Sequence, residues 1–494
     1  MFGLPVLTRP AQAAVRRSGR RPKRIIHLVS DGMSSGTLTC ADHLSRLIRK
    51  RPLTWIELYQ REGSVVGLVD MRSLNSLVTD SAAASSTWGC GSRVKNGAVN
   101  MLPDGRPLRP VCSLFGEAGW ARGLVTTTEI THATPAGFAA NVTHRDKAQT
   151  IALQYLERRI EVLLGGGRKY FESTGREDKR DLKSEYRAWG YEVVEDRQGL
   201  AAASLGGRWL GMFASGHLPF TVDREASADL QAEVPTLAEM TRRALDRLDR
   251  YGRFLLQVEG GRVDHGAHDS DAAGAFYDQI AFDEALDVCL EYQRREPETL
   301  LVMTTDHGNS NPGLNGMGTD YAKSPELLSN LVKVQASFSQ IETRLLKAAG
   351  AKAKGKRRHA DDEPERDVLD VAPGMLADVL EEATGYRLPK RRAGLLASYL
   401  RGDAEPLYAS LDTLPAQLGQ VLANYLGIGW TGNAHTSDHV NLLAIGPGAE
   451  RFRGFYAGTE VFRRYTDLAG IKFRNPEVPL LAESRPSAAE VESG

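Results

Sequence analysis

Cysteine is scarce in this chain of 494 residues, which contains four: Cys40, Cys90, Cys112 and Cys289. None of them forms a CxxC pair, which argues against a thiolate zinc site and against a thioredoxin-like redox motif. Their wide spacing does not indicate a scaffold held by disulfides. We therefore expect buried free thiols.

Long hydrophobic runs and an excess of either charge are missing as well. No stretch of about 18 uncharged apolar residues occurs, which excludes a transmembrane helix. Lys plus Arg and Asp plus Glu each number 62, so the charge gives no reason to expect binding to nucleic acid or to an anionic membrane. The apolar share of 41% is typical of a globular protein, and the length allows one large domain with an insertion or two domains.

Both ends of the chain differ from its middle. The segment Ala11-Gln12-Ala13 looks like a signal-peptidase site, and a short apolar stretch precedes it. We expect residues 1–24 to be a tail that is the remnant of an export signal, which predicts a periplasmic or secreted protein; the alternative is a basic disordered tail. The composition of residues 481–494 predicts a disordered tail.

Short Val-, Ile- and Leu-rich runs alternate with patterns of helix length. Strands are predicted at 25–29, 65–69, 123–127, 160–164, 253–258, 299–305 and 440–445, and helices at 81–91, 147–159, 236–250 and 272–294. This alternation predicts an α/β fold with a mostly parallel central sheet flanked by helices. Ligands bind beyond the carboxyl ends of such strands, so polar residues that follow strands are the first candidates for a site.

Residues 318–430 interrupt this alternation before the last predicted strand. Helical patterns are predicted there at 366–383, 392–401 and 414–426. A basic run followed by an acidic run predicts a mobile charged loop at 347–365, interpreted as solvated rather than as an anion site. We predict one catalytic domain over 25–480 with an inserted helical cap at 318–430.

Two polar residues stand where predicted elements end or begin. Asp31 directly follows a buried strand, where it is either a turn residue or a ligand at the edge of the sheet. Ser81 lies in Thr79-Asp80-Ser81 before an alanine run that predicts a helix, so Asp80 or Ser81 is its N-cap. A serine at a helix N-terminus could also serve as a nucleophile if a base or a metal activates it.

The stretch after the strand at 123–127 contains further candidates. Thr134 precedes Pro135, so it is either a helix cap or a hydroxyl ligand for a hard cation. Arg145 could bind a phosphate with its forked guanidinium, although a surface ion pair explains it equally well.

Acidic residues and histidines cluster after three more strands. Glu259 ends one strand, and Asp264 and His268 follow it four positions apart, on one face if the segment is helical. Aspartate and histidine at such spacing suit zinc. Asp306 and His307 directly follow another buried strand, and His435 precedes the last one. Such groups are expensive to bury unless they are paired or bind a metal.

In this order the stretches resemble the alkaline phosphatase family. The diagnostic segments are SDGM at 30–33, TDSAAASSTW at 79–88, THATPAG at 131–137, VEGGRVDHGAH at 258–268, TTDHG at 304–308 and HTSDH at 435–439. The resemblance covers about residues 25–310 and 430–460. The ordered set is specific, although no single segment is.

The resemblance implies a role for each candidate. Ser81 would be the nucleophile that becomes a phosphoserine, and Arg145 would bind the phosphate oxygens. Two zinc ions and one magnesium ion would be held by three groups of side chains: Asp264, His268 and His435; Asp31, Asp306 and His307; and Asp31, Thr134 and Glu259. His132 and His265 stand where family members differ, as third-site ligands or supporting residues.

The resemblance also implies hydrolysis of small phosphate monoesters with broad specificity, an alkaline pH optimum and a homodimer. The alternatives are a phosphodiesterase or a sulfatase of the same superfamily, and a metal-binding protein without catalysis. Ser81 lacks the Cys-x-Pro-x-Arg or Ser-x-Pro-x-Arg context of sulfatases. Thr134, Glu259 and Arg145 together favour monoesters over diesters.

Overall fold

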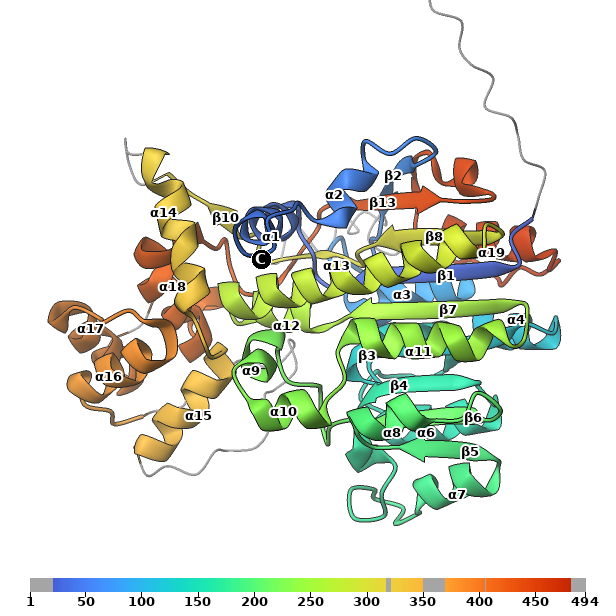
Figure 1. The fold of residues 1–494 in the computed structure, drawn as a ribbon, viewed down its shortest axis with the longest axis horizontal. Coiled ribbons are helices and arrows are strands. Elements are labelled where there is room, and N and C mark those ends of the chain that lie inside the picture. The colour runs from blue at the N-terminus through green and yellow to red at the C-terminus, as the bar shows by residue number, and fades with distance from the viewer. Residues whose placement is uncertain (1–20, 317–320, 350–368, 405, 481–494) are drawn as a thin grey trace, which may run out of the picture.

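A computed structural model describes residues 21–316, 321–349, 369–404 and 406–480. The centre of the molecule is a ten-stranded sheet (Figure 1). From edge to edge its strands are β14 (Gly454–Ala457), β2 (Val65–Asp70), β13 (Val440–Ile445), β8 (Thr299–Thr304), β1 (Arg24–Ser30), β7 (Phe254–Gly260), β3 (Ala121–Glu129), β4 (Val162–Gly166), β6 (Arg208–Met212) and β5 (Tyr191–Val194). Strand β13 pairs antiparallel with both of its neighbours, and the other pairs are parallel. The predicted mostly parallel sheet is confirmed.

Successive residues of the central strands pack into two different apolar cores. In β1, Ile26 and Leu28 belong to one core, and Ile25 and Val29 belong to the other. The first core is covered by α1 (Ser35–Ile48), α2 (Thr54–Leu58), α8 (Arg197–Ala202), α9 (Thr221–Glu225), α10 (Ala228–Glu233), α11 (Leu237–Asp249), α12 (Arg262–His268) and α13 (Ala272–Arg295). The second is covered by α3 (Ser81–Cys90), α4 (Val111–Glu117), α5 (Ala133–Ala139), α6 (Ala148–Glu157), α7 (Leu182–Ala188) and α19 (Thr459–Ala469).

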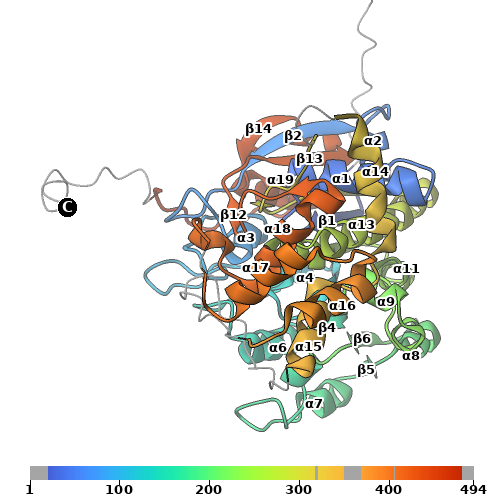
Figure 2. The ribbon, with the colours of Figure 1, turned by 90° about the vertical axis from the view of Figure 1, so that its left-hand side faces the viewer.

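The insertion forms a helical cap beyond the carboxyl ends of the parallel strands, at the left of Figure 1 and toward the viewer in Figure 2. Its helices are α14 (Ser324–Ser329), α15 (Phe338–Ala348), α16 (Pro373–Thr384), α17 (Lys390–Leu400) and α18 (Leu414–Leu426). Its two ends run side by side, because β9 (Gly308–Asn309) pairs with β12 (His435–Thr436) and β10 (Gly313–Leu314) pairs with β11 (Ile428–Gly429). The cap therefore begins and ends at the same edge of the sheet.

The cap is fixed to the body by buried carboxylates. Asp223 accepts hydrogen bonds from the backbone N–H and the hydroxyl of Ser337, both at 2.7 Å. Asp271 accepts one from the Phe338 N–H, also at 2.7 Å. Ser337 and Phe338 form the N-terminus of α15, whose free N–H groups need acceptors. The first turn of α15 is thus held by the body of the protein.

Several boundaries differ from those predicted. The pattern at 366–383 predicts a helix, but α16 begins at Pro373, because proline has no N–H to donate and favours the first helical position. Thr134 is not a helix cap, since α5 begins at Ala133 with His132 before it. Strands β5 and β6 and helix α1 were not among the predicted elements.

Four predicted segments lie partly or wholly outside the described residues. The parts that lie outside are 1–20 of the N-terminal tail, 350–365 of the charged loop, 366–368 of the helix predicted at 366–383, and the whole C-terminal tail 481–494. The beginning of the predicted loop, at 347–348, belongs to the last turn of α15 instead.

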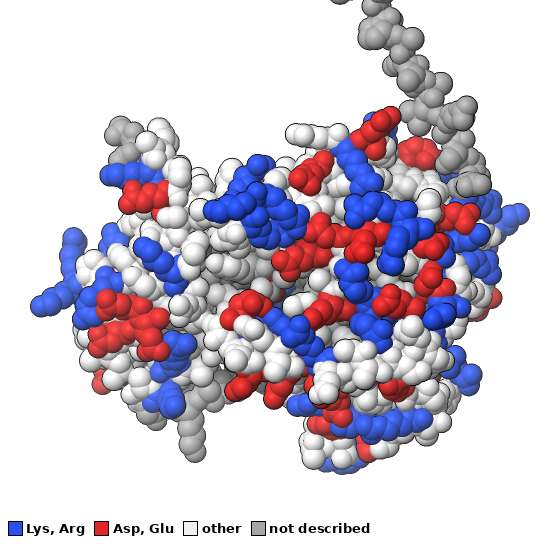
Figure 3. All heavy atoms as spheres, in the orientation of Figure 1, with Lys and Arg blue, Asp and Glu red and all other residues white. Residues whose placement is uncertain are grey.

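The cysteines, the lack of long apolar helices and the surface charge agree with what the sequence predicts. All four cysteines are free and buried, as expected. Within the described ranges, no helix has the length and apolar character needed to cross a membrane. Lys and Arg side chains alternate with Asp and Glu on the face shown in Figure 3, in line with the balanced charge.

Candidate active site

Ser81, the candidate nucleophile, is the first residue of α3 and is 1% exposed. Asp80 is the N-cap, and its Oδ1 accepts a hydrogen bond from the Ala83 N–H at 2.8 Å. The Ser81 Oγ lies 3.2 Å from Nε2 of His307. Because Asp80 is the cap, the serine hydroxyl is left facing the site, at a helix end that favours negative charge.

Asp264, His268 and His435 converge on one point. The two histidine Nε2 atoms lie 3.0 Å apart, and they lie 3.3 and 3.7 Å from oxygens of Asp264. Nδ1 of His268 lies 2.7 Å from the Asn433 carbonyl, and Nδ1 of His435 lies 2.9 Å from the Thr79 carbonyl. A carbonyl only accepts, so each Nδ1 bears the proton and each Nε2 presents a lone pair. Two lone pairs facing each other beside a carboxylate fit a bound cation.

A second group forms around His307. Its Nε2 lies 3.1 Å from Asp306 Oδ2 and 3.6 Å from Asp31 Oδ1. Both of these carboxylate oxygens are buried and lack a hydrogen-bond partner within the described part of the chain. Ligand atoms of Asp31, Asp264 and His307 lie within 4.8 Å of one another, so Asp264 borders this group as well as the first. Unpartnered buried carboxylate oxygens are costly, and a divalent cation between them would remove that cost.

A third group lies on the other side of Asp31. Thr134 Oγ1 donates to Asp31 Oδ2 at 3.4 Å. Glu259 Oε2 accepts from the Thr126 hydroxyl at 2.5 Å, whereas its buried Oε1 has no hydrogen-bond partner among the described residues and lies 4.0 Å from His132 Nδ1. Burial raises the pKa of Glu259 to about 7. This mainly oxygen-based set suits magnesium, but His132 also brings a ring nitrogen within 4.8 Å of Asp31 and Glu259.

Arg145 is held beside the nucleophile by two side chains. It donates to Asp80 Oδ2 at 3.3 Å and to His132 Nε2 at 3.0 Å. Since arginine only donates, His132 must accept through Nε2, and burial, followed by the nearby Arg145 charge, lowers the pKa of His132 to about 3. The arginine is thus oriented by one carboxylate and one neutral imidazole.

His132 and His265 form a cluster with a third histidine, His217. Their ring centroids lie between 4.5 and 5.6 Å apart. Burial, and then the neighbouring His217, lowers the pKa of His265 well below its usual value. Its Nδ1 lies 2.6 Å from a guanidinium nitrogen of Arg262, so this imidazole also accepts from an arginine. His132 and His265 are therefore neutral acceptors, each bound to an arginine, beside the third group.

All of the residues singled out in the sequence meet at one place. The structure brings together Ser81, Arg145, Asp31, Asp264, His268, Asp306, His307, His435, Thr134, Glu259, His132 and His265. The sequence predicted Asp80 or Ser81 as the helix cap but gave no sign of the contact between Asp80 and Arg145. Sequence analysis also missed His217, for which the sequence offered only the segment FASGHLPF at 213–220.

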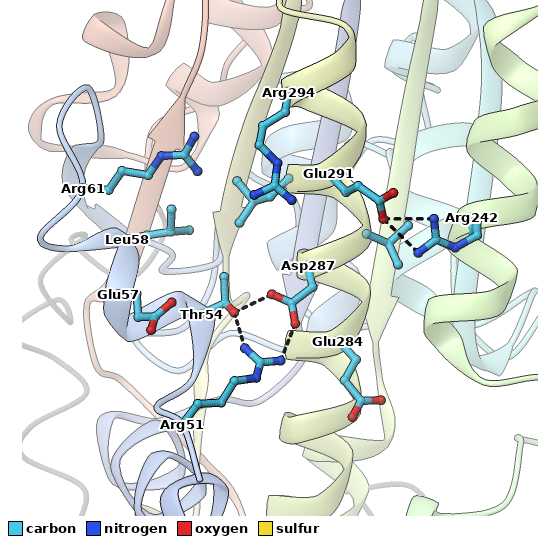
Figure 4. Close-up of a pocket in the computed structure, with 12 residues that line it drawn as sticks. Arg51, Thr54, Glu57, Leu58, Arg61, Arg242, Glu284, Asp287, Glu291 and Arg294 are labelled. Carbon is cyan, nitrogen blue, oxygen red and sulfur yellow. Dashed lines mark hydrogen bonds and ion pairs between the residues drawn. The ribbon is translucent and has the colours of Figure 1, made fainter. Parts of the chain in front are cut away.

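A separate hollow of about 570 Å³ lies along the half of α13 that leads away from this site (Figure 4). Charged side chains of both signs line it. Arg51 pairs with Asp287 at 2.5 Å, and Arg242 pairs with Glu291 at 3.0 Å. Its charges are thus largely satisfied within the protein, and it offers none of the convergent unpaired groups of the candidate site.

The sequence profile of the alkaline phosphatase family matches residues 22–471 of this chain. The chain belongs to the alkaline phosphatase family. A repressible alkaline phosphatase of Saccharomyces cerevisiae is 29% identical, over 88% of this chain and 78% of its own length. A streptomycin-6-phosphate phosphatase of Streptomyces griseus is 36% identical, over 62% of this chain and 78% of its own length.

Solved structures agree with this assignment. The crystal structure of Thermus thermophilus alkaline phosphatase matches with a TM-score of 0.81 and 33% identity, and the match covers 95% of this chain and 96% of that one. The family and fold expected from the sequence are confirmed. As an alkaline phosphatase, the chain is a phosphoric monoester hydrolase, and the family's dependence on metals agrees with the three groups of acids and imidazoles.

Proposed function

We propose that this alkaline phosphatase hydrolyses small phosphate monoesters through a phosphoserine on Ser81, with two zinc ions and one magnesium ion. One observation carries the proposal: the Ser81 hydroxyl lies 3.2 Å from His307 Nε2, and that nitrogen lies 3.1 and 3.6 Å from buried oxygens of Asp306 and Asp31 that lack hydrogen-bond partners among the described residues. A nucleophile beside a set of candidate metal ligands fits metal-assisted phosphoryl transfer.

Arg145 would bind the phosphate group of the substrate. Its guanidinium has five N–H donors in a planar fork, a shape that matches two oxygens of a phosphate. Asp80 and His132 accept from it and hold the fork beside Asp80, the residue that precedes Ser81. Arg145 would therefore set the phosphorus atom in line with the Ser81 Oγ.

Two displacements complete the reaction. In the first, Ser81 Oγ forms a bond to phosphorus while the ester bond breaks, and the alcohol leaves with a proton. In the second, a water oxygen bonds to the phosphorus of phosphoserine, inorganic phosphate leaves, and the hydroxyl of Ser81 is restored.

The donor sets support the choice of ions. Asp264, His268 and His435 would hold one zinc; Asp31, Asp306 and His307 would hold the other; and Asp31, Thr134 and Glu259 would hold magnesium. When bound, these ions supply positive charge that favours the deprotonated serine and water and balances the phosphate. Because deprotonation is needed, we propose an alkaline pH optimum.

Arg145→Ala should mainly weaken the binding of phosphate. Losing a charged hydrogen-bonding group costs about 1.5–3 kcal/mol, so the inhibition constant for inorganic phosphate should rise about tenfold or more. Steady-state kinetics with p-nitrophenyl phosphate measure it. Arg242→Ala, in the hollow of Figure 4, is the matched control and should behave as wild type. If Arg145→Ala lowered kcat as much as Ser81→Ala, which removes the proposed nucleophile, Arg145 would not act mainly in binding phosphate.

The most direct test of the whole proposal is to compare the rates at which the protein hydrolyses a phosphate monoester, a phosphate diester and a sulfate ester. Metal-replete protein should hydrolyse p-nitrophenyl phosphate far faster than bis-p-nitrophenyl phosphate or p-nitrophenyl sulfate. A preference for the diester or the sulfate would favour the corresponding alternative, and no turnover of any of the three would favour a metal-binding protein without catalysis.

We also propose that the protein is exported and forms a homodimer. Export is supported by the segment Ala11-Gln12-Ala13. An apolar stripe at the sheet edge supports a dimer: Val66 and Leu68 of β2 are 42% and 39% exposed, and Phe455, which is paired with Leu68 in β14, is 62% exposed. A monomeric mass in solution would rule out the dimer.

A further inference from the structure

The cap touches the loop that carries His435. Ser410, in the short 3-10 helix Ala409–Leu411, donates from its hydroxyl to Asn433 Oδ1 at 2.8 Å, and its Oγ accepts from the Asn433 N–H at 3.4 Å. Gly432 lies against the same cap segment: a Cβ there would stand 3.2 Å from Ser410 Oγ and 3.4 Å from the Tyr408 hydroxyl oxygen. Asn433 is therefore held by the cap through both its backbone and its side chain.

The backbone of Asn433 also supports a candidate metal ligand. Its carbonyl accepts from His268 Nδ1 at 2.7 Å. That bond fixes the proton on Nδ1 and turns the lone pair of Nε2 toward His435 and Asp264. The next carbonyl along, that of Ala434, accepts from the Ser310 N–H at 2.9 Å. The turn that orients His268 is thus held by the cap at Asn433 and by the body at Ala434.

We propose that Ser410 is a positioning residue for zinc, through Asn433 and His268. The inference rests on the proposed function, because it assumes that Asp264, His268 and His435 hold a zinc ion. It gives the cap a role beyond covering the site: one of its hydroxyl groups sets the orientation of a ligand in the body. Free rotation of Asn433 would let the carbonyl drift and would leave His268 to sample other orientations.

Zinc uptake by the full chain tests this inference without any substrate. Loss of an outer hydrogen bond to a metal ligand lowers affinity by about 10- to 100-fold, and a partner one bond further away should act at the lower end of that range. Ser410→Ala should therefore need about tenfold more free zinc to fill one site, measured by metal analysis in zinc-buffered solution. Asn433→Ala removes only the side-chain bond and keeps the backbone N–H, so its effect should be no larger than that of Ser410→Ala. The double variant should lose no more than Ser410→Ala alone, because that change already removes both bonds.

Three comparisons make the result decisive. Ser410→Thr, which keeps the hydroxyl, should restore the zinc curve. Ser329→Ala removes a cap hydroxyl that donates to the Glu326 carbonyl within α14, and it should leave zinc uptake unchanged. The melting temperature of metal-free Ser410→Ala should match that of metal-free Ser329→Ala; a lower value would assign Ser410 to cap stability and overturn the inference.

Two further outcomes separate this inference from the proposed function. Wild-type zinc uptake in Ser410→Ala, or additive losses in the double variant, would overturn the role of Ser410 alone. A wild-type protein that took up no zinc would overturn the proposed function and this inference together.

Discussion

Ser81→Ala should lose several orders of magnitude in the turnover of p-nitrophenyl phosphate while it keeps its fold and its metals. The serine Oγ is the atom that would accept the phosphoryl group, and alanine offers no substitute. The helix should persist, because its cap is the carboxylate of Asp80, which bonds to the Ala83 N–H and does not involve Ser81. Steady-state kinetics, metal analysis and thermal melting measure the three quantities.

A second serine of the same helix serves as the control. Ser85 is also fully buried in α3, and its hydroxyl donates to the Ala133 carbonyl at 3.0 Å. Ser85→Ala should lose stability of about 1 kcal/mol but retain turnover. Labelled phosphate trapped on the protein should map to Ser81 in wild type and should be missing from Ser81→Ala. Near wild-type activity in that variant would show that Ser81 is not the nucleophile.

The sequence could predict where three acidic residues lie, because each follows a buried strand. Asp31, Glu259 and Asp306 come at or just after the ends of β1, β7 and β8. These strands are parallel neighbours in the sheet, so their carboxyl ends, and the acids with them, meet at one edge. Hydrophobic runs reveal such strands even in a single sequence, and the ordered motifs then supplied the family.

Contacts between distant segments could not be predicted in the same way. Arg145 reaches Asp80 only because the loop after α5 returns beside the start of α3: the Arg145 N–H donates to the Gly97 carbonyl at 2.7 Å, and Gly97 in turn donates to Asp80 Oδ2. No local pattern encodes that approach.

The contacts of the cap with the body could not be predicted from the sequence either. Its helices have clear periodicity, and its return to the active-site edge follows from its place between His307 and His435. The pairing of Ser410 with Asn433 depends instead on how the packed cap lies against the body. Side chains of ordinary type acquire a specific position through such packing, and their sequence context carries no sign of it.

The stability of the folded protein should also depend strongly on bound metal ions, because the candidate metal ligands concentrate negative charge in a buried place. Burial, and then the nearby charges of Asp306, Asp264 and Glu259, raises the pKa of Asp31 well above its usual range. Burial likewise raises the pKa of Glu259 to about 7. Without cations, the folded protein therefore binds a proton on Glu259 that an unfolded chain would release, so the contribution of this carboxyl to stability falls as the pH rises toward about 7 and above. His132 and His435, whose pKa values burial lowers to about 3, act in the opposite direction, because the unfolded chain protonates them as the pH falls.

Removal of the metals with EDTA should abolish activity and lower the melting temperature, and zinc plus magnesium should restore both. An ion at 1,000 times its dissociation constant contributes about 4 kcal/mol to stability, so the loss of several ions should be large. As the pH rises from 6.5 to 8, the free energy of unfolding of the metal-free wild type should fall relative to that of metal-free Glu259→Gln, because only the wild type releases a proton from this buried carboxyl there. Thermal melting of both proteins at each pH measures the difference, and metal analysis gives the number of ions. Full activity after EDTA, or no more than one ion per chain in reconstituted protein, would contradict a centre with two zinc ions and one magnesium ion.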